Sequence, residues 1–202
     1  AWFKYFDVFP AGYQKITYGQ NADAEAKIDK IKLYRKGTEV NMVVDHQTKL
    51  ELATSLPGEY NAYNLAAAVS AAYLLNVGIK DIVEGVANLE GIPGRFDRID
   101  EGQPFDVIVD YAHTPDGYDK LLDTAKKITK NRVILVFGSC GDRDKAKRPI
   151  MGQIAAKKAD RIFLTDEESY NEDPQQIRDQ VSAGIEQAGG AAKTTEIADR
   201  TE

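Results

Sequence analysis

The feature that most constrains the fold of this chain is a set of three short apolar runs, each of which ends abruptly in a polar cluster. The runs are Val107–Val109, Val133–Phe137 and Arg161–Thr165. The clusters that follow them are Asp110–His113, Gly138–Asp144 and Thr165–Glu168. Runs of this length are typical of buried parallel strands, and ligands of open α/β sheets bind beyond the carboxyl ends of such strands. We therefore expect three parallel strands whose polar ends form one site.

Composition excludes several classes of protein. The 202 residues are 43% hydrophobic and 29% charged, which is enough to bury a core in one large or two small domains. No apolar stretch approaches the roughly 18 residues that span a bilayer, so we expect no membrane partner. The net charge of −6 argues against a general nucleic-acid binder, whose affinity rests on neutralising phosphates.

Cysteine and histidine are scarce. Cys140 is the only cysteine and there are two histidines, so no internal disulfide forms and a structural zinc site lacks ligands. We expect a reducing, cytoplasmic setting and assign no metal site. The chain starts at Ala1 without methionine inside an aromatic run and stops just after a polar turn, so we expect a piece of a longer protein.

The first part of the chain predicts a small antiparallel sheet followed by two helices. Residues 12–55 are expected to form three antiparallel strands without crossovers, at Lys15–Tyr18, Ile28–Arg35 and Glu39–His46. An alanine-rich apolar face with helical spacing predicts a helix over 59–76, and a second helix follows at 80–89. The sequence Gly91–Gly94 interrupts these patterns and marks a domain boundary.

Beyond this boundary, strands and helices alternate. Thr114 and Asp173 each precede a proline, and each pair predicts a helix start with a capping side chain. Leu121, Leu122 and Ile177 are among the positions expected to face the core. Alternation of this kind predicts right-handed βαβ units and a mostly parallel sheet, and therefore an α/β fold.

Two segments at the start of this second part carry candidate ligand-binding residues. Arg95 and Arg98 could reach a phosphate or ribose, or they could be solvated charges on a surface strand. Asp110 could accept from ribose hydroxyls or a hydrated metal ion, and His113 lies near a helix N-terminus that attracts anions. Equally, Asp110 and His113 could only cap nearby backbone groups.

The glycine-rich cluster Gly138–Asp144 does not contain the Gly-x-x-x-x-Gly-Lys-Ser/Thr pattern of a phosphate loop. Its glycines allow a sharp turn that aims Arg143, whose guanidinium suits a carboxylate. We interpret Cys140 as an inert small residue. The basic residues before Pro149 are interpreted as the solvated start of a helix; they are Lys145, Lys147 and Arg148.

A dense acidic cluster, Asp166-Glu167-Glu168, follows the third apolar run. It could recognise an ammonium group, or it could be an exposed approach to a helix, and the sequence alone slightly favours the second interpretation.

Five blocks together resemble the Mur ligase family in their order and spacing, and within it the tripeptide-synthetase branch that adds the third residue of the peptidoglycan stem peptide. The blocks are Tyr60–Asn64, Gly94–Phe96, Asp110–Asp116, Gly141–Pro149 and Glu172–Pro174. The resemblance implies that 1–92 end a central ATPase domain. It also implies that 93–202 form a Rossmann-like C-terminal ligase domain, incomplete at its end. The UDP-binding domain and phosphate loop are missing, so the chain alone is expected not to catalyse.

The resemblance also implies a reaction and site residues. ATP, with Mg²⁺, phosphorylates the carboxylate of UDP-N-acetylmuramoyl-L-Ala-D-Glu, and the amine of a free amino acid attacks the acyl phosphate. Asn61 and Asn64 then lie by the adenine, and Arg95 and Asp110 meet the ribose and phosphates. Asp110 and His113 are the expected catalytic residues, with His113 on the nucleotide side of the cleft. Arg143 matches the arginine that grips the carboxylate of the incoming amino acid.

One departure from the family pattern bears on the amino acid. Diaminopimelate-adding relatives carry Asp-Asn-Pro-Arg where this chain has Glu167-Glu168-Ser169-Tyr170, and Tyr170 cannot replace the charged fork of that arginine. Glu167 and Glu168 instead favour a side chain that ends in an ammonium, such as lysine or ornithine.

Two other functions stay open. The chain could belong to a folylpolyglutamate or cyanophycin-type synthetase, which share the ATPase core and an Asp-x-x-His block. It could also be a non-catalytic nucleotide-binding module.

Overall fold

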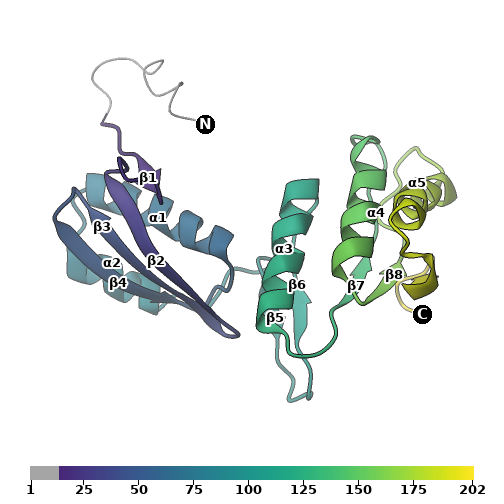
Figure 1. Cartoon of the computed structure of the whole chain (residues 1–202), viewed down its shortest axis with the longest axis horizontal. Coiled ribbons are helices and arrows are strands. Elements are labelled where there is room, and N and C mark those ends of the chain that lie inside the picture. Colours follow the sequence, from purple (N-terminus) through teal and green to yellow (C-terminus); the bar gives the residue numbers. More distant parts are fainter. Residues whose placement is uncertain (1–13) are drawn as a thin grey trace. The chain divides into compact units, whose positions relative to one another are not determined.

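The computed structural model describes residues 14–202, and the chain divides into two compact units, with Glu90 ending the first and Gly91 beginning the second (Figure 1). The first unit contains β1 (Tyr18–Gly19), β2 (Ala26–Tyr34), β3 (Gly37–Val44), β4 (Thr48–Thr54), α1 (Glu59–Leu74) and α2 (Ile79–Ala87). The second contains β5 (Asp97–Ile99), β6 (Val107–Val109), α3 (Pro115–Ile128), β7 (Ile134–Phe137), α4 (Lys147–Lys158), β8 (Arg161–Leu164), α5 (Pro174–Gln187), a 3-10 turn (Ala191–Lys193) and β9 (Thr194–Glu196).

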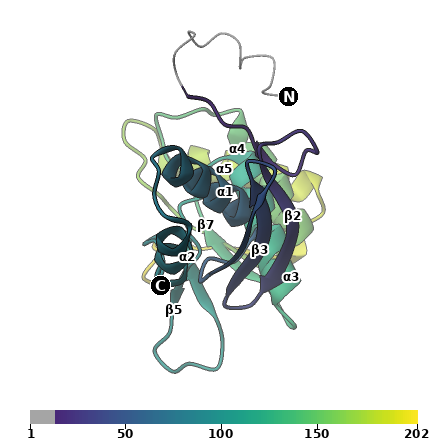
Figure 2. The same ribbon diagram turned by 90° about the vertical axis from the view of Figure 1, so that its left-hand side faces the viewer.

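The sheet of the first unit has the order β1-β2-β3-β4, with antiparallel β2-β3 and β3-β4 pairs. Val40, Met42 and Val44 alternate with more exposed residues along β3 and are buried, as the period-two pattern predicted. These side chains pack with Ala66 and Val69 of α1 in one core cluster. Figure 2 shows α1 and α2 on the same side of this sheet.

The strands expected in the first unit were partly wrong. The strand expected at Lys15–Tyr18 is reduced to Tyr18–Gly19 and runs parallel to β2. The Glu25 carboxylate accepts from Thr17 N–H at 2.9 Å, and Glu25 N–H donates to Thr17 Oγ1 at 3.0 Å. These side-chain bonds, with one backbone bond from Ala26 N–H to the carbonyl oxygen of Thr17, connect the chain before Tyr18 to β2. The sequence interpretation also missed β4, although its leucines alternate with polar residues. Residues 12 and 13 lie outside the described part of the chain.

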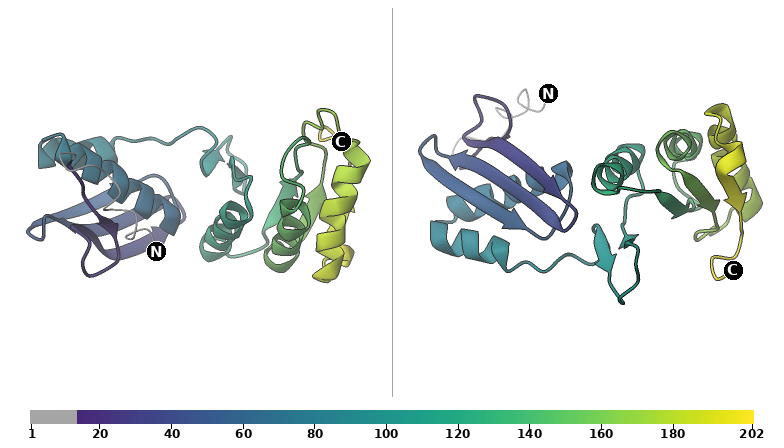
Figure 3. Two further views of the ribbon diagram at one scale, coloured as in Figure 1. Left: turned by 90° about the horizontal axis from the view of Figure 1, so that it is seen from above. Right: turned by 60° about the horizontal axis from the view of Figure 1, so that its bottom comes forward.

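The α/β class is confirmed in the second unit. Parallel strands pair in the order β7-β8-β9, with α4 and α5 as the crossover helices. Thr114 Oγ1 accepts from Gly117 N–H at the start of α3, and Asp173 Oδ1 accepts from two N–H groups at the start of α5, so both predicted caps are present. Figure 3 shows α3, α4 and α5 side by side. Ile162 and Leu164 of β8 lie in the core beneath them.

The prediction that Val107–Val109 is a buried parallel strand was wrong. β6 pairs antiparallel with β5, and Val109 is 48% exposed. Within the described residues no ladder joins β6 to β7, and Ile134 and Val136 of β7 are each 54% exposed. A groove of about 200 Å³, lined by residues of β6, α3 and β7, lies between these two strands. Of this run only Ile108 lines the groove, and its ladder pairing is with β5.

Two glycines bring α4 and α5 into backbone contact. A Cβ on Gly152 would lie 2.2 Å from the carbonyl oxygen of Val181, and a Cβ on Gly184 would lie 1.9 Å from that of Pro149. Neither helix could approach the other this closely with a larger residue at these positions. The two helices therefore form one tightly packed layer. No helix in residues 14–202 is long and apolar enough to cross a membrane.

Candidate functional site

Asp110 organises the turn that carries Arg95. Its Oδ2 accepts from the backbone N–H of Phe96 at 2.7 Å, and its Oδ1 accepts from that of Ala112 at 2.8 Å. Phe96 is buried with a φ of 49°, a conformation that costs energy in a non-glycine residue. The carboxylate thus stabilises a strained turn in which the Arg95 side chain is exposed.

Arg95, Tyr111 and His113 form an exposed cluster beside this turn. The Arg95 guanidinium lies 5.2 Å from the centroid of the Tyr111 ring, and the rings of Tyr111 and His113 are 5.0 Å apart. His113 Nδ1 is 2.9 Å from the carbonyl oxygen of Tyr111, while Lys147 Nζ donates to the carbonyl oxygen of His113. The loop after β6 is therefore tied to the first residue of α4.

Tyr118 of α3 lies where the loops after β6, β7 and β8 meet. Burial and the nearby Glu167 carboxylate, with smaller effects of Asp110 and Cys140, raise the pKa of the Tyr118 hydroxyl above its usual range. Its ring packs on Phe137 with a centroid distance of 5.4 Å. The sequence analysis did not identify Tyr118. Its spacing of three and four residues from Leu121 and Leu122, which were predicted to face the core, could have done so.

The loops after β7 and β8 are bound to each other by their backbones. Gly141 N–H donates to the carbonyl oxygen of Glu168 at 2.9 Å. A Cβ on Gly141 would lie 1.8 Å from the carbonyl oxygen of Ser169, so only glycine allows this approach. Asn171 Nδ2 adds a bond of 2.7 Å to Asp142 Oδ2. Gly141 is thus required for the close contact between the loop after β7 and the loop after β8.

Arg148 is fully buried, so the interpretation of Lys145, Lys147 and Arg148 as a solvated helix start was wrong for this residue. Its Nη1 and Nη2 each donate to one oxygen of Glu172 at 2.9 Å. Nη1 also donates to Gln180 Oε1 at 2.8 Å, and Nη2 to the carbonyl oxygen of Cys140 at 3.0 Å. A buried guanidinium is tolerated because four acceptors bind its Nη1 and Nη2 groups, although its Nε has no partner among the described residues.

Glu172 collects several donors besides Arg148. Lys145 Nζ lies 2.9 Å from its Oε2, and the backbone N–H of Asp142 donates to its Oε1 at 2.7 Å. The hydrogen bonds from Arg148 and then Lys145 lower the pKa of the Glu172 carboxyl to about 2. Glu172 therefore stays ionised at neutral pH, and its carboxylate joins the loop after β8 to the loop after β7.

Arg143 and Tyr170 come together on the outside of these two loops. The guanidinium carbon of Arg143 lies 5.4 Å from the centroid of the exposed Tyr170 ring, and Arg143 Nη1 donates to the carbonyl oxygen of Asp142 at 3.0 Å. Asp142 and Tyr170 have φ values of 50° and 51°, in the left-handed region. An arginine held against an aromatic ring can still direct free N–H groups at a carboxylate.

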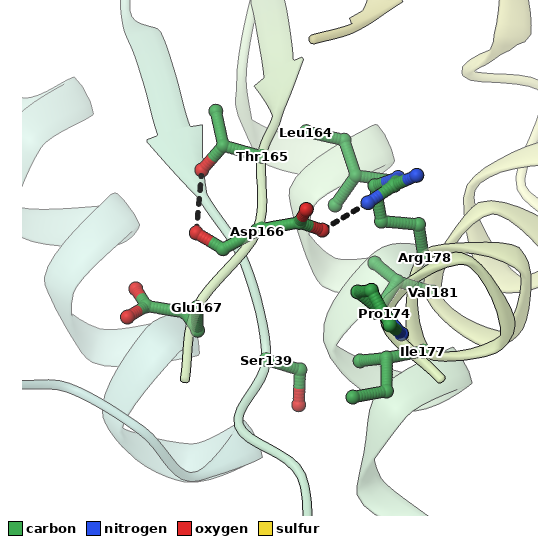
Figure 4. A pocket seen from close by; sticks show the side chains of 9 residues that line it. All are labelled: Ser139, Leu164, Thr165, Asp166, Glu167, Pro174, Ile177, Arg178 and Val181. Carbon is green, nitrogen blue, oxygen red and sulfur yellow. Dashed lines mark hydrogen bonds and ion pairs between the residues drawn. The ribbon is translucent and has the colours of Figure 1, made fainter. Parts of the chain in front are cut away.

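The carboxylates of the acidic cluster after β8 are mostly engaged by arginines, and the cluster lies in the segment that leads to α5. In Figure 4 the Asp166 carboxylate points to Arg178, with which it forms an ion pair, and Glu167 points the other way. Arg200 Nη2 lies 2.7 Å from Glu167 Oε1 and also donates to Thr165 Oγ1. Glu168 is exposed, and within residues 14–202 its side chain has no ion-pair partner. Glu168 therefore differs from Asp166 and Glu167, whose carboxylates are paired with arginines.

Ser139 and Thr165 line a narrow pocket at the ends of β7 and β8 (Figure 4). The pocket is too tight for a water molecule, and the buried Ser139 hydroxyl has no hydrogen-bond partner among the described residues. Among the described residues, no group of three His, Cys, Asp or Glu side chains could hold a metal ion. Cys140 is a free cysteine of intermediate exposure.

The predicted adenine residues lie on α1 of the first unit. Asn61 is buried, its Nδ2 donates to the carbonyl oxygen of Pro57 at 2.8 Å, and its Oδ1 accepts from Asn64 Nδ2 at 3.2 Å. Asn61 thus fixes the first turn of α1, while Asn64 is exposed.

A parallel sheet with polar loops beyond its strand ends places the second unit among ligand-binding α/β domains. Residues 94–202 match the family described as "Mur ligase, glutamate ligase domain", and residues 6–72 match "Mur ligase middle domain". The chain belongs to the Mur ligase family, as its five sequence blocks predicted.

Curated relatives match most of this chain. The chain is 39% identical over 187 residues to the UDP-N-acetylmuramoyl-L-alanyl-D-glutamate–2,6-diaminopimelate ligase of Geobacillus thermodenitrificans, with 93% of the chain and 38% of the relative covered. It is 34% identical over 185 residues to the UDP-N-acetylmuramyl-tripeptide synthetase of Roseiflexus sp., with 92% and 36% covered. The chain thus spans little more than a third of the length of these relatives.

Solved structures show the same fold. A UDP-N-acetylmuramoyl-L-alanyl-D-glutamate–2,6-diaminopimelate ligase is 34% identical with a TM-score of 0.58, and the match covers 98% of this chain and 40% of that one. The UDP-N-acetylmuramate-alanine ligase of Thermotoga maritima is 21% identical with a TM-score of 0.74, and the match covers 92% and 40%. The second likeness concerns the fold alone.

Proposed function

We propose that the whole protein is an ATP-dependent ligase of peptidoglycan synthesis that adds a diamino acid to UDP-N-acetylmuramoyl-L-Ala-D-Glu. The observation that carries this proposal is the Arg143–Tyr170 pair, presented by two bonded loops in a chain of the Mur ligase family. The names of the relatives from Geobacillus and Roseiflexus support the same reaction. Residues 1–92 then end the central ATPase domain, and 93–202 belong to the C-terminal ligase domain.

In this proposal Arg143 binds the α-carboxylate of the incoming amino acid. The exposed guanidinium offers paired N–H donors that match a carboxylate, and the Tyr170 ring limits its rotation. When the α-carboxylate is held in place, the amino group of the substrate can be oriented toward the acyl phosphate. Such orientation lowers the barrier of a step between two reactants.

ATP supplies the phosphoryl group that turns the substrate carboxylate into an acyl phosphate, with Mg²⁺ offsetting charge. The described side chains fit a nucleotide in part. Arg95 offers an exposed cation for phosphates, and Asp110 retains carboxylate lone pairs for a ribose hydroxyl. The His113 ring packs against Tyr111, the residue that Arg95 also contacts. Asn64 is exposed to meet an adenine edge next to Asn61. We propose Asp110 and His113 as the residues of this group that act in catalysis.

For the amino acid we propose lysine or a similar side chain that ends in an ammonium. Glu168 is exposed and unpaired among residues 14–202, and it follows Glu167, which Arg200 already engages. Tyr170 replaces the arginine that the diaminopimelate pattern requires. A second candidate, 2,6-diaminopimelate, is favoured by the names of several relatives.

The test uses the full-length enzyme with UDP-N-acetylmuramoyl-L-Ala-D-Glu and ATP, and measures kcat/KM for lysine, ornithine and meso-diaminopimelate. We expect lysine or ornithine to be preferred, and Glu168→Gln to reduce that preference more than the control Glu51→Gln on β4. A clear preference for meso-diaminopimelate would defeat the lysine assignment and retain the ligase. Turnover of folate or of a polypeptide instead would favour the folylpolyglutamate or cyanophycin-type alternatives.

A non-catalytic nucleotide-binding module is the remaining alternative, and it predicts no ATP turnover by the full-length protein.

We propose a cytoplasmic location, where the nucleotide substrates are present. The 202-residue chain alone is proposed to be inactive, since the relatives extend well beyond the length it spans.

A further inference from the structure

We propose that the buried Arg148–Glu172 pair positions Arg143 for the incoming amino acid. This inference rests on the proposed ligase function and adds to it two residues that touch no substrate. Arg148 lies in the first turn of α4, and Glu172 lies just before α5. The Arg148 side chain is fully buried and that of Glu172 is 14% exposed, whereas the Arg143 and Tyr170 side chains are exposed.

The first step of the argument is that the pair joins both loops at several points. Arg148 Nη2 donates to the carbonyl oxygen of Cys140 in the loop after β7, and both Nη atoms hold Glu172 in the loop after β8. Glu172 in turn accepts from the backbone N–H of Asp142. One guanidinium and one carboxylate therefore fix the spacing of the two loops.

The second step is that these anchors are the direct neighbours of the site residues. Asp142 precedes Arg143, and both its N–H and its side chain are bonded to the other loop, at Glu172 and Asn171. Tyr170 lies between Ser169, which contacts Gly141, and Asn171. The exposed Arg143 and Tyr170 side chains are thus held from both sides by residues that depend on the buried pair.

The third step is that Arg148 is itself held on a rigid support. Its Nη1 donates to Gln180 of α5, and the α4–α5 layer is closed by backbone contacts at Gly152 and Gly184. A lysine at position 148 could replace the charge but could not reach Glu172, Gln180 and Cys140 together, since a single ammonium lacks the planar fork. The geometry, more than the charge, is what Arg148 supplies.

The experiment is done on the full-length enzyme and measures KM for the amino acid, KM for ATP and kcat separately. We expect Arg148→Lys and Glu172→Gln each to raise the KM for the amino acid about tenfold or more, because small displacements of a binding group are costly. We expect KM for ATP to stay within about twofold, since Arg95, Asp110 and His113 are bonded through other contacts.

Two further variants keep the test decisive if Arg148→Lys does not fold. Asn171→Ala removes an exposed bond to Asp142 and leaves the core intact, and it should raise the amino-acid KM about threefold. Lys158→Ala is the matched control. It breaks two partly exposed ion pairs, with Asp119 and Asp123, at the opposite end of α4 from Arg148, so it should lower Tm with both KM values unchanged.

A uniform rise in the KM of every substrate, or an unchanged KM for the amino acid in Glu172→Gln and Asn171→Ala, would overturn the positioning role. These results differ from failure of the proposed function. In that case the unaltered full-length enzyme joins no amino acid to the muramoyl dipeptide, whatever residue stands at position 148.

Discussion

Oδ2 of Asp110 and the backbone N–H of Phe96 form a hydrogen bond of 2.7 Å across a left-handed turn that presents Arg95. This hydrogen bond stabilises the turn whether or not a nucleotide binds. We expect Asp110→Ala to destabilise the chain by about 2 kcal/mol, because two backbone donors lose a charged acceptor. Urea denaturation measures this loss. Asp116→Ala, which removes an exposed partner of Lys120, should cost under about 0.5 kcal/mol. Equal effects of the two substitutions would contradict the prediction.

Gly141 is predicted to tolerate no side chain. In Gly141→Ala the new Cβ meets the carbonyl oxygen of Ser169 at 1.8 Å, so the two loops must separate. We expect a loss of about 3 kcal/mol or more in unfolding free energy. The matched control is Gly85→Ala in the middle of α2, where nothing lies within 4 Å of the added methyl. That change should stabilise the chain by about 1 kcal/mol, and thermal unfolding of both variants measures the contrast.

Glu172 makes the stability of the second unit sensitive to acid. Its carboxyl pKa is lowered in the folded chain to about 2, mainly by Arg148 and then Lys145, whereas an unfolded glutamate titrates near 4.3. When folding lowers the pKa of a carboxyl group, the carboxylate stabilises the folded state at any pH above the pKa of the unfolded chain. This stabilisation is lost as the pH falls toward the pKa of the folded chain. We therefore expect the urea concentration at the unfolding midpoint to decrease as the pH is lowered from about 5 to about 2.

The Glu172→Gln variant isolates this contribution. It should be less stable than the unaltered chain at neutral pH, and its urea midpoint should fall less steeply over the same acid range. An identical slope in both proteins would show that other carboxylates cause the acid sensitivity.

The facing edges of β6 and β7 are predicted to make the 202-residue chain self-associate. Val109 and Val136 are exposed beside backbone groups that no strand pairs within residues 14–202. Unpaired apolar edges of this kind are templates for strand addition. We expect Val109→Lys to reduce self-association in sedimentation experiments. Leu75→Lys, which removes a more exposed apolar side chain at the end of α1, should have little effect.

Local signals in the sequence predicted most of the elements. Thr114 and Asp173 cap helices where their positions before proline indicated, and the period-two pattern of β3 identified its buried face. These features depend on residues close in the chain. The pairing of β6 does not, because an apolar run of three residues is compatible with either a parallel sheet or a hairpin.

The sequence predicted several residues of the candidate site but not how they are arranged in space. Arg143 and the glycines around it were identified from their cluster, yet its stacking on Tyr170 joins segments 27 residues apart. Arg148 was interpreted as solvated because a charged residue at a helix start is usually exposed. Its burial depends on four acceptors from Glu172, Gln180 and Cys140, a coincidence that no local pattern encodes.

The glycine contacts between α4 and α5 carry a consequence for how this domain can vary. At Gly152 and Gly184 even a methyl group would force two backbones apart, and Arg148 reaches across the same helix layer to Gln180. A deep mutational scan should therefore find these two glycines as intolerant as Arg143 itself, although neither touches a ligand. In the proposed function, we expect changes in amino-acid preference to arise at Glu168 and Tyr170, which are exposed and lie outside this helix layer.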